Sequence, residues 1–305
     1  MSDSYKFGMV ALLGPPNAGK STLMNQYLGQ KVAIVSPRPQ TTRNRISGIL
    51  TEDDSQVVFL DTPGIHRLRG KMNRFLLDSA WSALSSCDCV VVMLDAALYA
   101  AKPHLMDKEI EPLVKPVKSS GLPVLVAVNK ADKLKDKAEI LPVMQKIAEM
   151  FPDAEVYPIS ALKGDGAPEL LGGVMKHLPE GPPMFPEDQI STVPLRFMAS
   201  EVIREKIFYS LHQELPYGTA VEIEQWDEDA ERGLVTIHAA IYTTKKNHKG
   251  MIIGKQGATL KKIGTAAREE LEEMLEMKVH LELWVKVRDN WTEDTGFLRG
   301  LGLGE

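Results

Sequence analysis

The stretch GPPNAGKS, residues Gly14–Ser21, decides how the rest of the chain is interpreted. It follows the apolar run Phe7–Gly14 and opens a helical pattern, so it joins a strand to a helix. It also fits G-x-x-x-x-G-K-[ST] at every specified position. Glycines in such a loop let backbone N–H groups surround phosphate oxygens at a helix N-terminus. The stretch therefore predicts a phosphate-binding loop, with Lys20 reaching the outer phosphates and the Ser21 hydroxyl holding Mg²⁺.

Outward from this loop, short apolar runs rich in β-branched residues alternate with amphipathic stretches. Continuous apolar strands indicate burial on both faces, so we predict a mostly parallel sheet with helices on both faces. This α/β domain of the P-loop class is predicted to cover residues 1–180. Its predicted strands are Phe7–Gly14, Gln56–Gly64, Cys89–Ala96, Pro123–Lys130 and Glu155–Ser160.

A proline-rich stretch, Leu178–Thr192, follows this domain and suits neither a helix interior nor a central strand. We predict a linker at residues 181–193. Beyond it the order of elements changes to helix, two strands, two helices around a second glycine loop, and a strand, which predicts a smaller α+β domain over residues 194–305. The longer predicted elements are a helix over Leu195–Leu215 and strands at Thr219–Trp226, Gly233–Thr244 and Lys278–Val287.

Composition and charge narrow the possible classes of function and location. The 305-residue chain has 44% apolar residues and a net charge of −5, which argues against an indiscriminate nucleic-acid binder. Its apolar runs are far shorter than the roughly 20 residues of a membrane helix, and MSDSYK is no signal peptide, so we predict a cytoplasmic protein. Cys87 and Cys89, two residues apart on a predicted strand, are predicted to be buried, inert thiols.

Although the net charge is negative, one segment is strongly basic. From Arg232 to Arg268 the chain has eight basic residues and no acidic one, which predicts an anion-facing surface.

The stretch NKAD, Asn129–Asp132, directly follows a predicted buried strand and indicates which base is bound. An aspartate there can accept hydrogen bonds from the N1–H and 2-amino groups of guanine. Adenine offers neither donor and would leave a desolvated carboxylate unpaired, a mismatch that can cost about four orders of magnitude in discrimination. The triplet SAL, Ser160–Leu162, would place the Ala161 N–H near the guanine carbonyl. The sequence therefore predicts guanine rather than adenine nucleotides.

The stretch DTPG, Asp61–Gly64, closes another predicted strand. Asp61 is predicted to hold Mg²⁺ through a water molecule, and Gly64 to let its N–H meet the γ-phosphate. Between this stretch and the first loop lies a polar, turn-rich segment in which Thr42, or alternatively Thr41, would complete the Mg²⁺ shell when the third phosphate is present. The predicted metal ligands are Ser21, Thr42 and Asp61. The nucleotide would thus act as a conformational switch.

A second glycine loop, GKQG (Gly254–Gly257), lies between two short helical patterns and resembles the G-x-x-G loop of a type II KH domain. That module clamps about four nucleotides of single-stranded backbone while an apolar groove takes the bases. Any one of Met251, Ile252 and Ile253 could line this groove or belong to the core. The predicted RNA-binding residues are Lys249, Met251, Ile252, Ile253, Gly254, Lys255, Gln256, Gly257, Lys261 and Lys262.

Together the stretches GPPNAGKS, QTTRN, DTPGIH, NKAD and SAL resemble the translation-factor-related GTPases. With RFMASEVIREKI and HLELWVKV in the C-terminal module, nearly the whole chain is similar to the Era family of ribosome-assembly GTPases. The resemblance implies slow, Mg²⁺-dependent hydrolysis of GTP to GDP by a monomer. It also implies binding to the 3′ end of 16S rRNA during assembly of the small (30S) ribosomal subunit, and loose association with the cytoplasmic face of the inner membrane.

The predicted nucleotide site follows from the matching stretches. Four of its residues are predicted to be catalytic: Asn17, Lys20, Thr42 and Gly64. The predicted GTP-binding residues are Gly14, Pro15, Pro16, Asn17, Ala18, Gly19, Lys20, Ser21, Thr22, Asp61, Thr62, Pro63, Gly64, Ile65, Asn129, Lys130, Ala131, Asp132, Ser160, Ala161 and Leu162.

One departure concerns Ile65, which stands where signalling GTPases keep the glutamine that orients the attacking water. Either hydrolysis is negligible and the protein is a nucleotide-regulated RNA-binding adapter, or backbone groups and the phosphate itself position the water. Asn17 resembles the residue that helps potassium-stimulated relatives hold K⁺ across the phosphates, which predicts K⁺ as a second cofactor. A membrane-surface switch would need a basic amphipathic helix, and the acidic, glycine-rich segment after Asp289 counts against it.

Overall fold

The computed structural model describes residues 5–66 and 70–303, which form two compact units. The main boundary along the chain lies between Thr192 and Val193. Each unit has its own sheet and its own hydrophobic core.

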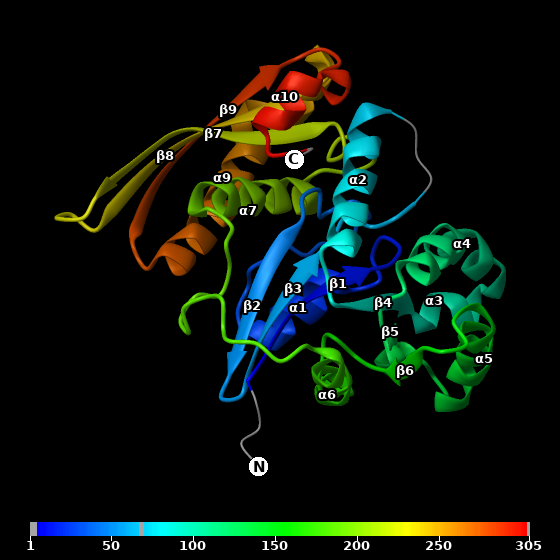
Figure 1. Cartoon of the computed structure of the whole chain (residues 1–305). Helices are drawn as coiled ribbons and strands as arrows, with labels where there is room; N and C mark the ends of the chain where they lie inside the picture. The colour runs from blue at the N-terminus through cyan, green and yellow to red at the C-terminus, as the bar shows by residue number, and fades with distance from the viewer. Residues whose placement is uncertain (1–4, 67–69, 304–305) are drawn as a thin grey trace. The chain divides into compact units, whose positions relative to one another are not determined.

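The first unit is built on a six-stranded sheet with the strand order β2-β3-β1-β4-β5-β6 (Figure 1). β2 runs antiparallel to β3, and the other pairs are parallel, which confirms the predicted mostly parallel sheet. The strands are β1 (Lys6–Leu13), β2 (Ile46–Glu52), β3 (Ser55–Asp61), β4 (Cys89–Asp95), β5 (Val124–Asn129) and β6 (Glu155–Pro158).

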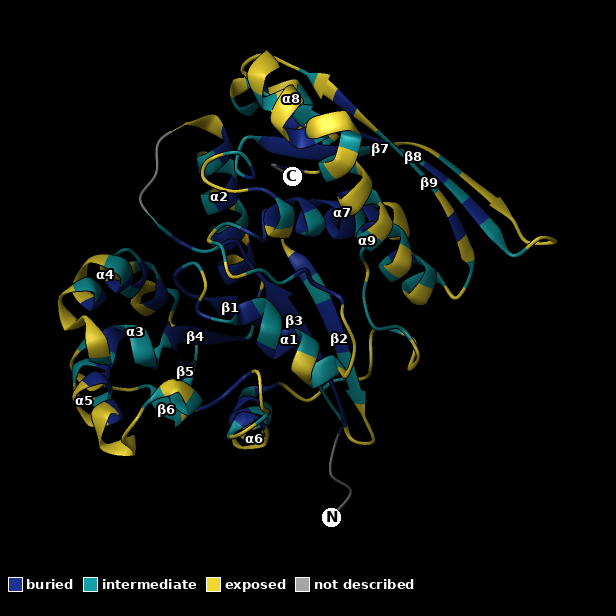
Figure 2. Ribbon diagram, turned by 180° about the vertical axis from the view of Figure 1, so that it is seen from behind, coloured by how far each residue is buried: buried dark blue, intermediate teal, exposed yellow. Residues whose placement is uncertain are grey.

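Helices cover both faces of this sheet. The helices are α1 (Lys20–Leu28), α2 (Lys71–Ser85), α3 (Ala96–Ala101), α4 (Pro103–Ser120), α5 (Leu141–Met150) and α6 (Ala167–His177). Residues of α2 to α5 share one core with alternate residues of the strands, such as Leu13 and Val92. On the other face Tyr27 of α1 stacks on Phe59 of β3 with ring centroids 5.0 Å apart. The strands are therefore largely buried on both sides, while the outer faces of the helices and several loops are exposed (Figure 2).

β2 was not predicted, because its sequence ISGILTE has a glycine at its centre, which weakens a strand pattern. The structure explains that glycine. A Cβ on Gly48 would lie 2.7 Å from Leu28 Cδ1 and 2.8 Å from Met24 Sδ, so α1 approaches the strand too closely for a side chain. Gly48 thus reflects close helix packing and not the end of a strand.

The proline-rich segment is not a free linker along its whole length. Gln56 of β3 is fully buried and accepts from the backbone N–H groups of Met184 and Phe185 at 2.9 and 3.0 Å. Further on, Ile49 N donates to Ile190 O at 2.8 Å, and the Thr192 and Ser47 hydroxyls lie 2.6 Å apart. The segment up to Thr192 is therefore held along the first unit.

The second unit is a three-stranded sheet, order β7-β8-β9, packed against helices. β8 is antiparallel to β7 and parallel to β9, and α9 is the crossover between β8 and β9. The elements are α7 (Leu195–Ser210), β7 (Thr219–Asp229), β8 (Leu234–Thr243), α8 (Lys246–Ile253), α9 (Ala258–Leu275), β9 (Lys278–Val287) and α10 (Thr295–Gly300). This order confirms the predicted smaller α+β domain.

Two predictions about the helices of this unit were wrong or incomplete. α7 ends at Ser210 and not at Leu215, because the backbone is already extended at Leu211, with φ −105° and ψ 158°. α10 was not predicted; Asp294 caps it by accepting from Phe297 N at 3.1 Å. Trp291 just before it is fully buried and donates its Nε1–H to Gly218 O.

Candidate functional site

The first glycine loop, which joins β1 to α1, needs its glycines for two reasons. Gly14 and Gly19 have φ angles of 151° and 101°, which residues with a Cβ rarely adopt. A Cβ on Gly14 would lie 2.3 Å from Met93 O, and one on Gly19 would lie 2.1 Å from Asn129 Nδ2. The loop is thus fixed against the carboxyl ends of the neighbouring strands, where open α/β sheets bind ligands.

Lys20 is buried at the start of α1, and its ammonium is held by backbone carbonyls of the glycine loop. Its Nζ donates to Gly14 O at 3.2 Å and to Pro15 O at 3.1 Å. Burial lowers the pKa of Lys20 to about 8, and the neighbouring Asp61 carboxylate acts in the opposite direction. A bound anion would stabilise the charged form, so the site is ready for phosphate.

Three oxygen-bearing side chains meet beside Lys20. Ser21 Oγ donates to Asp61 Oδ2 at 2.5 Å, and Thr42 Oγ1 lies 3.0 Å from Ser21 Oγ and 3.4 Å from Asp61 Oδ2. Asp61 Oδ1 is buried and has no hydrogen-bond partner within residues 5–66 and 70–303. Burial raises the pKa of Asp61 to about 6, while Lys20 pulls it down. Hard oxygen donors with one orphaned carboxylate oxygen fit the demands of Mg²⁺.

The structure also separates the two candidate threonines. The Thr41 hydroxyl donates to Arg38 O at 2.9 Å and lies 2.6 Å from Ser36 Oγ, so it is engaged within its own loop. Thr42 alone of the two reaches Ser21 and Asp61.

Lys20 gives the first testable prediction, a loss of GDP affinity at high pH. In the empty site the ammonium loses its proton near pH 8, whereas bound phosphates hold that proton, so binding above pH 8 must take up a proton. The Kd for GDP should be nearly constant from pH 6.8 to 7.5 and rise up to about tenfold per pH unit above 8. Titration calorimetry at fixed Mg²⁺ measures this. Lys20→Arg stays charged and so serves as the control for titration of the guanine base. A rise in Kd equal to that of Lys20→Arg would refute the prediction.

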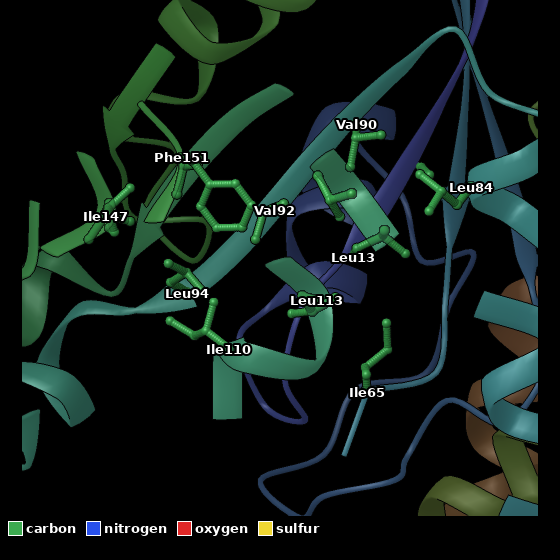
Figure 3. Close-up of a cluster of buried hydrophobic side chains, with 14 of the residues drawn as sticks. Leu13, Ile65, Leu84, Val90, Val92, Leu94, Ile110, Leu113, Ile147 and Phe151 are labelled. Atoms are coloured by element: carbon green, nitrogen blue, oxygen red, sulfur yellow. The ribbon is translucent and has the colours of Figure 1, made fainter. Parts of the chain in front are cut away.

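The DTPG loop lies directly on the first glycine loop. A Cβ on Gly64 would lie 2.6 Å from both the N and Cα atoms of Pro16, and Ile65 N donates to Gly14 O at 3.0 Å. The Ile65 side chain is buried in the core of the first unit, near Leu13 and Leu113 (Figure 3). Ile65 can therefore contact a nucleotide only through its backbone, and its side chain is not positioned to orient water.

The side-chain amide of Asn129 joins the NKAD stretch to the first glycine loop and to the SAL stretch. Asn129 Nδ2 donates to Ala18 O at 2.7 Å, and its Oδ1 accepts from Ala161 N at 2.8 Å, so it ties the first loop to the SAL stretch. Asp132 is partly exposed, and its carboxylate makes no hydrogen bond or ion pair with any residue of the described chain. Leu162 is 73% exposed. Asp132 is thus free to accept from a ligand.

Three residues near the site were not predicted from sequence. His66 Nδ1 donates to Gly64 O at 2.9 Å, and its Nε2 lies 2.7 Å from Gln40 Nε2, which connects the DTPG loop with the loop that carries Thr42. Asp95 ends β4 and pairs with Lys130. The sequence carried a signal for two of them. His66 directly follows DTPGI, and Asp95 closes a central strand, where ligand sites of α/β sheets lie.

The second glycine loop joins α8 to α9 and also requires its glycines. Gly254 and Gly257 have φ angles of 74° and 80°, and a Cβ on Gly254 would lie 2.2 Å from Thr259 Oγ1. Four exposed lysines surround this loop, and none of their ammonium groups has an acidic partner in the part of the chain that the structure describes. They are Lys249, Lys255, Lys261 and Lys262. An unneutralised lysine cluster at an open backbone loop favours a polyanionic ligand.

The apolar residues ahead of this loop divide between surface and core. Met251 is 54% exposed, and Ile253 is half-buried against the core of the second unit. Ile252 is fully buried in that core, so its place among the predicted RNA contacts was wrong. Consecutive residues of a helix point in different directions, and the inward one cannot reach a ligand.

Comparison with known proteins identifies both domains. Residues 9–130 match the family described as 50S ribosome-binding GTPase, and residues 214–292 match the KH domain. The chain is 58% identical over 301 residues to GTPase Era of Nitratidesulfovibrio vulgaris, covering 99% of this chain and 98% of that one. The chain belongs to the Era family of GTPases. GTPase Era of Geobacter metallireducens is 45% identical, with 99% of both chains covered.

Solved Era structures extend this likeness to three dimensions. One is Era with MgGDPNP and nucleotides 1506–1542 of 16S ribosomal RNA; it has 38% identity, a TM-score of 0.91 and covers 98% of this chain and 99% of that one. A variant of Aquifex aeolicus Era bound to GDP and AlF₄⁻ has 38% identity, a TM-score of 0.88 and covers 97% and 99%. The predicted family, the P-loop GTPase domain followed by a KH domain, and the GTP-hydrolysing activity are confirmed. As an Era GTPase the protein is an enzyme, so the alternative of an adapter with negligible hydrolysis is not supported.

Proposed function

We propose that this Era GTPase binds the 3′ end of 16S rRNA as a single strand during assembly of the small ribosomal subunit. The observation that carries the proposal is the lysine cluster around GKQG, defined by Lys249, Lys255, Lys261 and Lys262, whose charges no described acidic residue neutralises. The exposed Met251 beside it offers an apolar surface for bases. The Era relative that contains 16S rRNA nucleotides supports the choice of RNA.

In the first unit we propose that GTP lies along the glycine loop with Mg²⁺ held by Ser21 and Thr42 and, through water, by Asp61. The ion would neutralise charge on the phosphates. The Lys20 ammonium and the backbone N–H groups of the loop would stabilise the charge that develops as the terminal phosphate leaves. Because the Ile65 side chain is buried, backbone groups of the DTPG loop are left to orient the attacking water.

The lysine cluster predicts a salt dependence of RNA binding. Each lysine that neutralises a phosphate contributes about −0.7 to the slope of log K against log salt for a single strand. Lys255→Ala and Lys261→Ala should each flatten the slope by about that amount, whereas Lys278→Ala, which changes an exposed lysine outside the cluster, should not. Fluorescence anisotropy with a labelled RNA over a series of KCl concentrations measures the slope. Equal slopes in the wild type and both cluster variants would remove the assignment.

K⁺ is proposed as a second cofactor on the basis of Asn17. Its side-chain amide donates to Pro37 O at 3.2 Å, so it lies between the glycine loop and the Thr42 loop. If the Asn17 oxygen holds K⁺ beside the phosphates, hydrolysis in NaCl should be at least about tenfold slower than in KCl. Asn17→Gly, which tolerates the left-handed φ of 62°, should remove the difference. Equal phosphate release in the two salts would count against the site.

Three statements stay predictions: a monomer and loose membrane association, which the family resemblance implies, and a cytoplasmic location, which the short apolar runs indicate. Among residues 5–66 and 70–303 no helix has both the length and the apolar character to cross a bilayer. Light scattering of the purified protein and flotation with anionic vesicles would test the first and the third.

A further inference from the structure

The Asp95 carboxylate, at the end of β4, is held at both of its oxygens. Oδ2 lies 2.5 Å from Lys130 Nζ, and Oδ1 accepts from Leu98 N at 3.0 Å, which caps α3. Asp95 is the register partner of Asn129 in the parallel pair of β4 and β5, so it stands beside the first residue of NKAD. The Asp95 carboxylate is therefore fixed next to NKAD, the stretch predicted to bind the base. The proposed binding of phosphates and Mg²⁺ does not use it.

The ion pair between Asp95 and Lys130 is largely shielded from water. The Asp95 and Lys130 side chains are 17% and 22% exposed, and at a lower effective dielectric such a pair is stronger than one on the open surface. Lys130 itself has a left-handed φ of 63°, a conformation that a residue with a Cβ seldom adopts. The ion pair holds the Lys130 side chain toward Asp95.

Asp132 lies only two residues further on, in the short turn Ala131–Lys133. Its carboxylate is the one that must accept from guanine, and no described residue pairs with it. A lysine ammonium that was free to move could reach a carboxylate two residues away. An ammonium held on one oxygen of this carboxylate would leave only the other oxygen for the base, so N1–H could still be accepted while the acceptor for the 2-amino group was lost.

We propose that Asp95 determines base specificity indirectly: it sequesters the Lys130 ammonium and so keeps the Asp132 carboxylate unpaired for guanine. Asp95 is a positioning residue, because it acts through Lys130 and does not itself touch the base. The proposal rests on the role of Asp132 as the base reader.

The test compares GDP with inosine diphosphate, which keeps the N1–H but lacks the 2-amino group. The ratio of their Kd values therefore reports one hydrogen bond to Asp132. In full-length Asp95→Asn the asparagine oxygen can still cap α3, while the charge that holds Lys130 is gone. The ratio should fall about tenfold, which is 1.4 kcal/mol. Asp95→Ser, which can also cap the helix, should give the same result if Asp95→Asn does not fold.

A second substitution separates this mechanism from a loss of packing. In Asp95→Asn/Lys130→Met the freed ammonium is absent, so the ratio should return to within about threefold of the wild-type value. Lys133→Met, which removes a neighbouring lysine that Asp95 does not hold, should leave the ratio unchanged. If α3 capping were the whole role of Asp95, GDP and inosine diphosphate would weaken equally and the double variant would not recover.

The outcomes also separate this inference from the proposed function. A wild-type protein that binds both nucleotides equally would show that Asp132 does not read the 2-amino group, and the base-reading role on which the inference rests would fail. A strong wild-type preference that persists unchanged in Asp95→Asn and Asp95→Ser would overturn the inference on Asp95 alone.

Discussion

Asp132→Asn is expected to weaken binding of GDP and GTP about a thousandfold or more and to make xanthosine nucleotides the preferred ligands. The asparagine oxygen can still accept from N1–H, but its amide nitrogen is a donor that faces the 2-amino donor of guanine. Xanthine has a carbonyl at that position and pairs with the donor instead. The size of the effect follows from the state of Asp132, whose carboxylate has no partner within the described chain and is available to the base.

Competition calorimetry with GDP, xanthosine diphosphate and ADP measures this change of preference. Asp153→Asn is the matched control, because it removes the same charge from an exposed position before β6. The prediction fails if Asp132→Asn binds GDP within threefold of the wild type. It also fails if ADP, which has neither donor, competes as well as GDP with the unmodified protein.

The second large effect is expected at Lys20. Lys20→Ala should reduce multiple-turnover release of phosphate from GTP by at least about a hundredfold, since it removes a buried cation aimed at the phosphates. The nucleotide-free protein should nevertheless stay folded. Burial already lowers the pKa of Lys20 to about 8, so the empty site carries the cost of an incompletely solvated charge, which the alanine removes.

Two measurements separate a catalytic effect from a folding defect. The free energy of unfolding without nucleotide should change by no more than about 1 kcal/mol. RNA affinity should also be retained, because the lysine cluster lies in the other unit. A variant that released phosphate at a third of the wild-type rate would show that Lys20 does not serve the reaction.

Sequence patterns predicted the parts of the fold that depend on periodicity. The buried parallel strands and the buried thiols Cys87 and Cys89 are present as predicted. β2 was missed because Gly48 interrupts its pattern, and the glycine is explained only by a helix packed across it. The end of α7 was misplaced since the apolar period continues past Ser210, while the backbone becomes extended at Leu211.

The candidate site likewise contains features that the sequence predicted and features that it could not predict. Fixed spacing within a loop placed Lys20 and Ser21 together, because one short stretch of chain carries both. The partners across loops needed coordinates: the sequence left Thr41 and Thr42 open, and only Thr42 lies beside Asp61. The direction of a side chain was also not predictable, as the inward Ile65 and Ile252 show. Asp95 could not be linked to Lys130 from sequence because the two meet only through the pairing of β4 with β5.

The most direct test of the account is whether its two glycine loops hold separate ligands at the same time. Full-length protein saturated with GDP and Mg²⁺ should be titrated with a single-stranded RNA that matches the 3′ end of 16S rRNA, while bound GDP is followed by a fluorescent label. We predict that one RNA binds per chain and that the GDP stays bound. Release of one GDP for each RNA bound, or no RNA binding at all, would contradict the account.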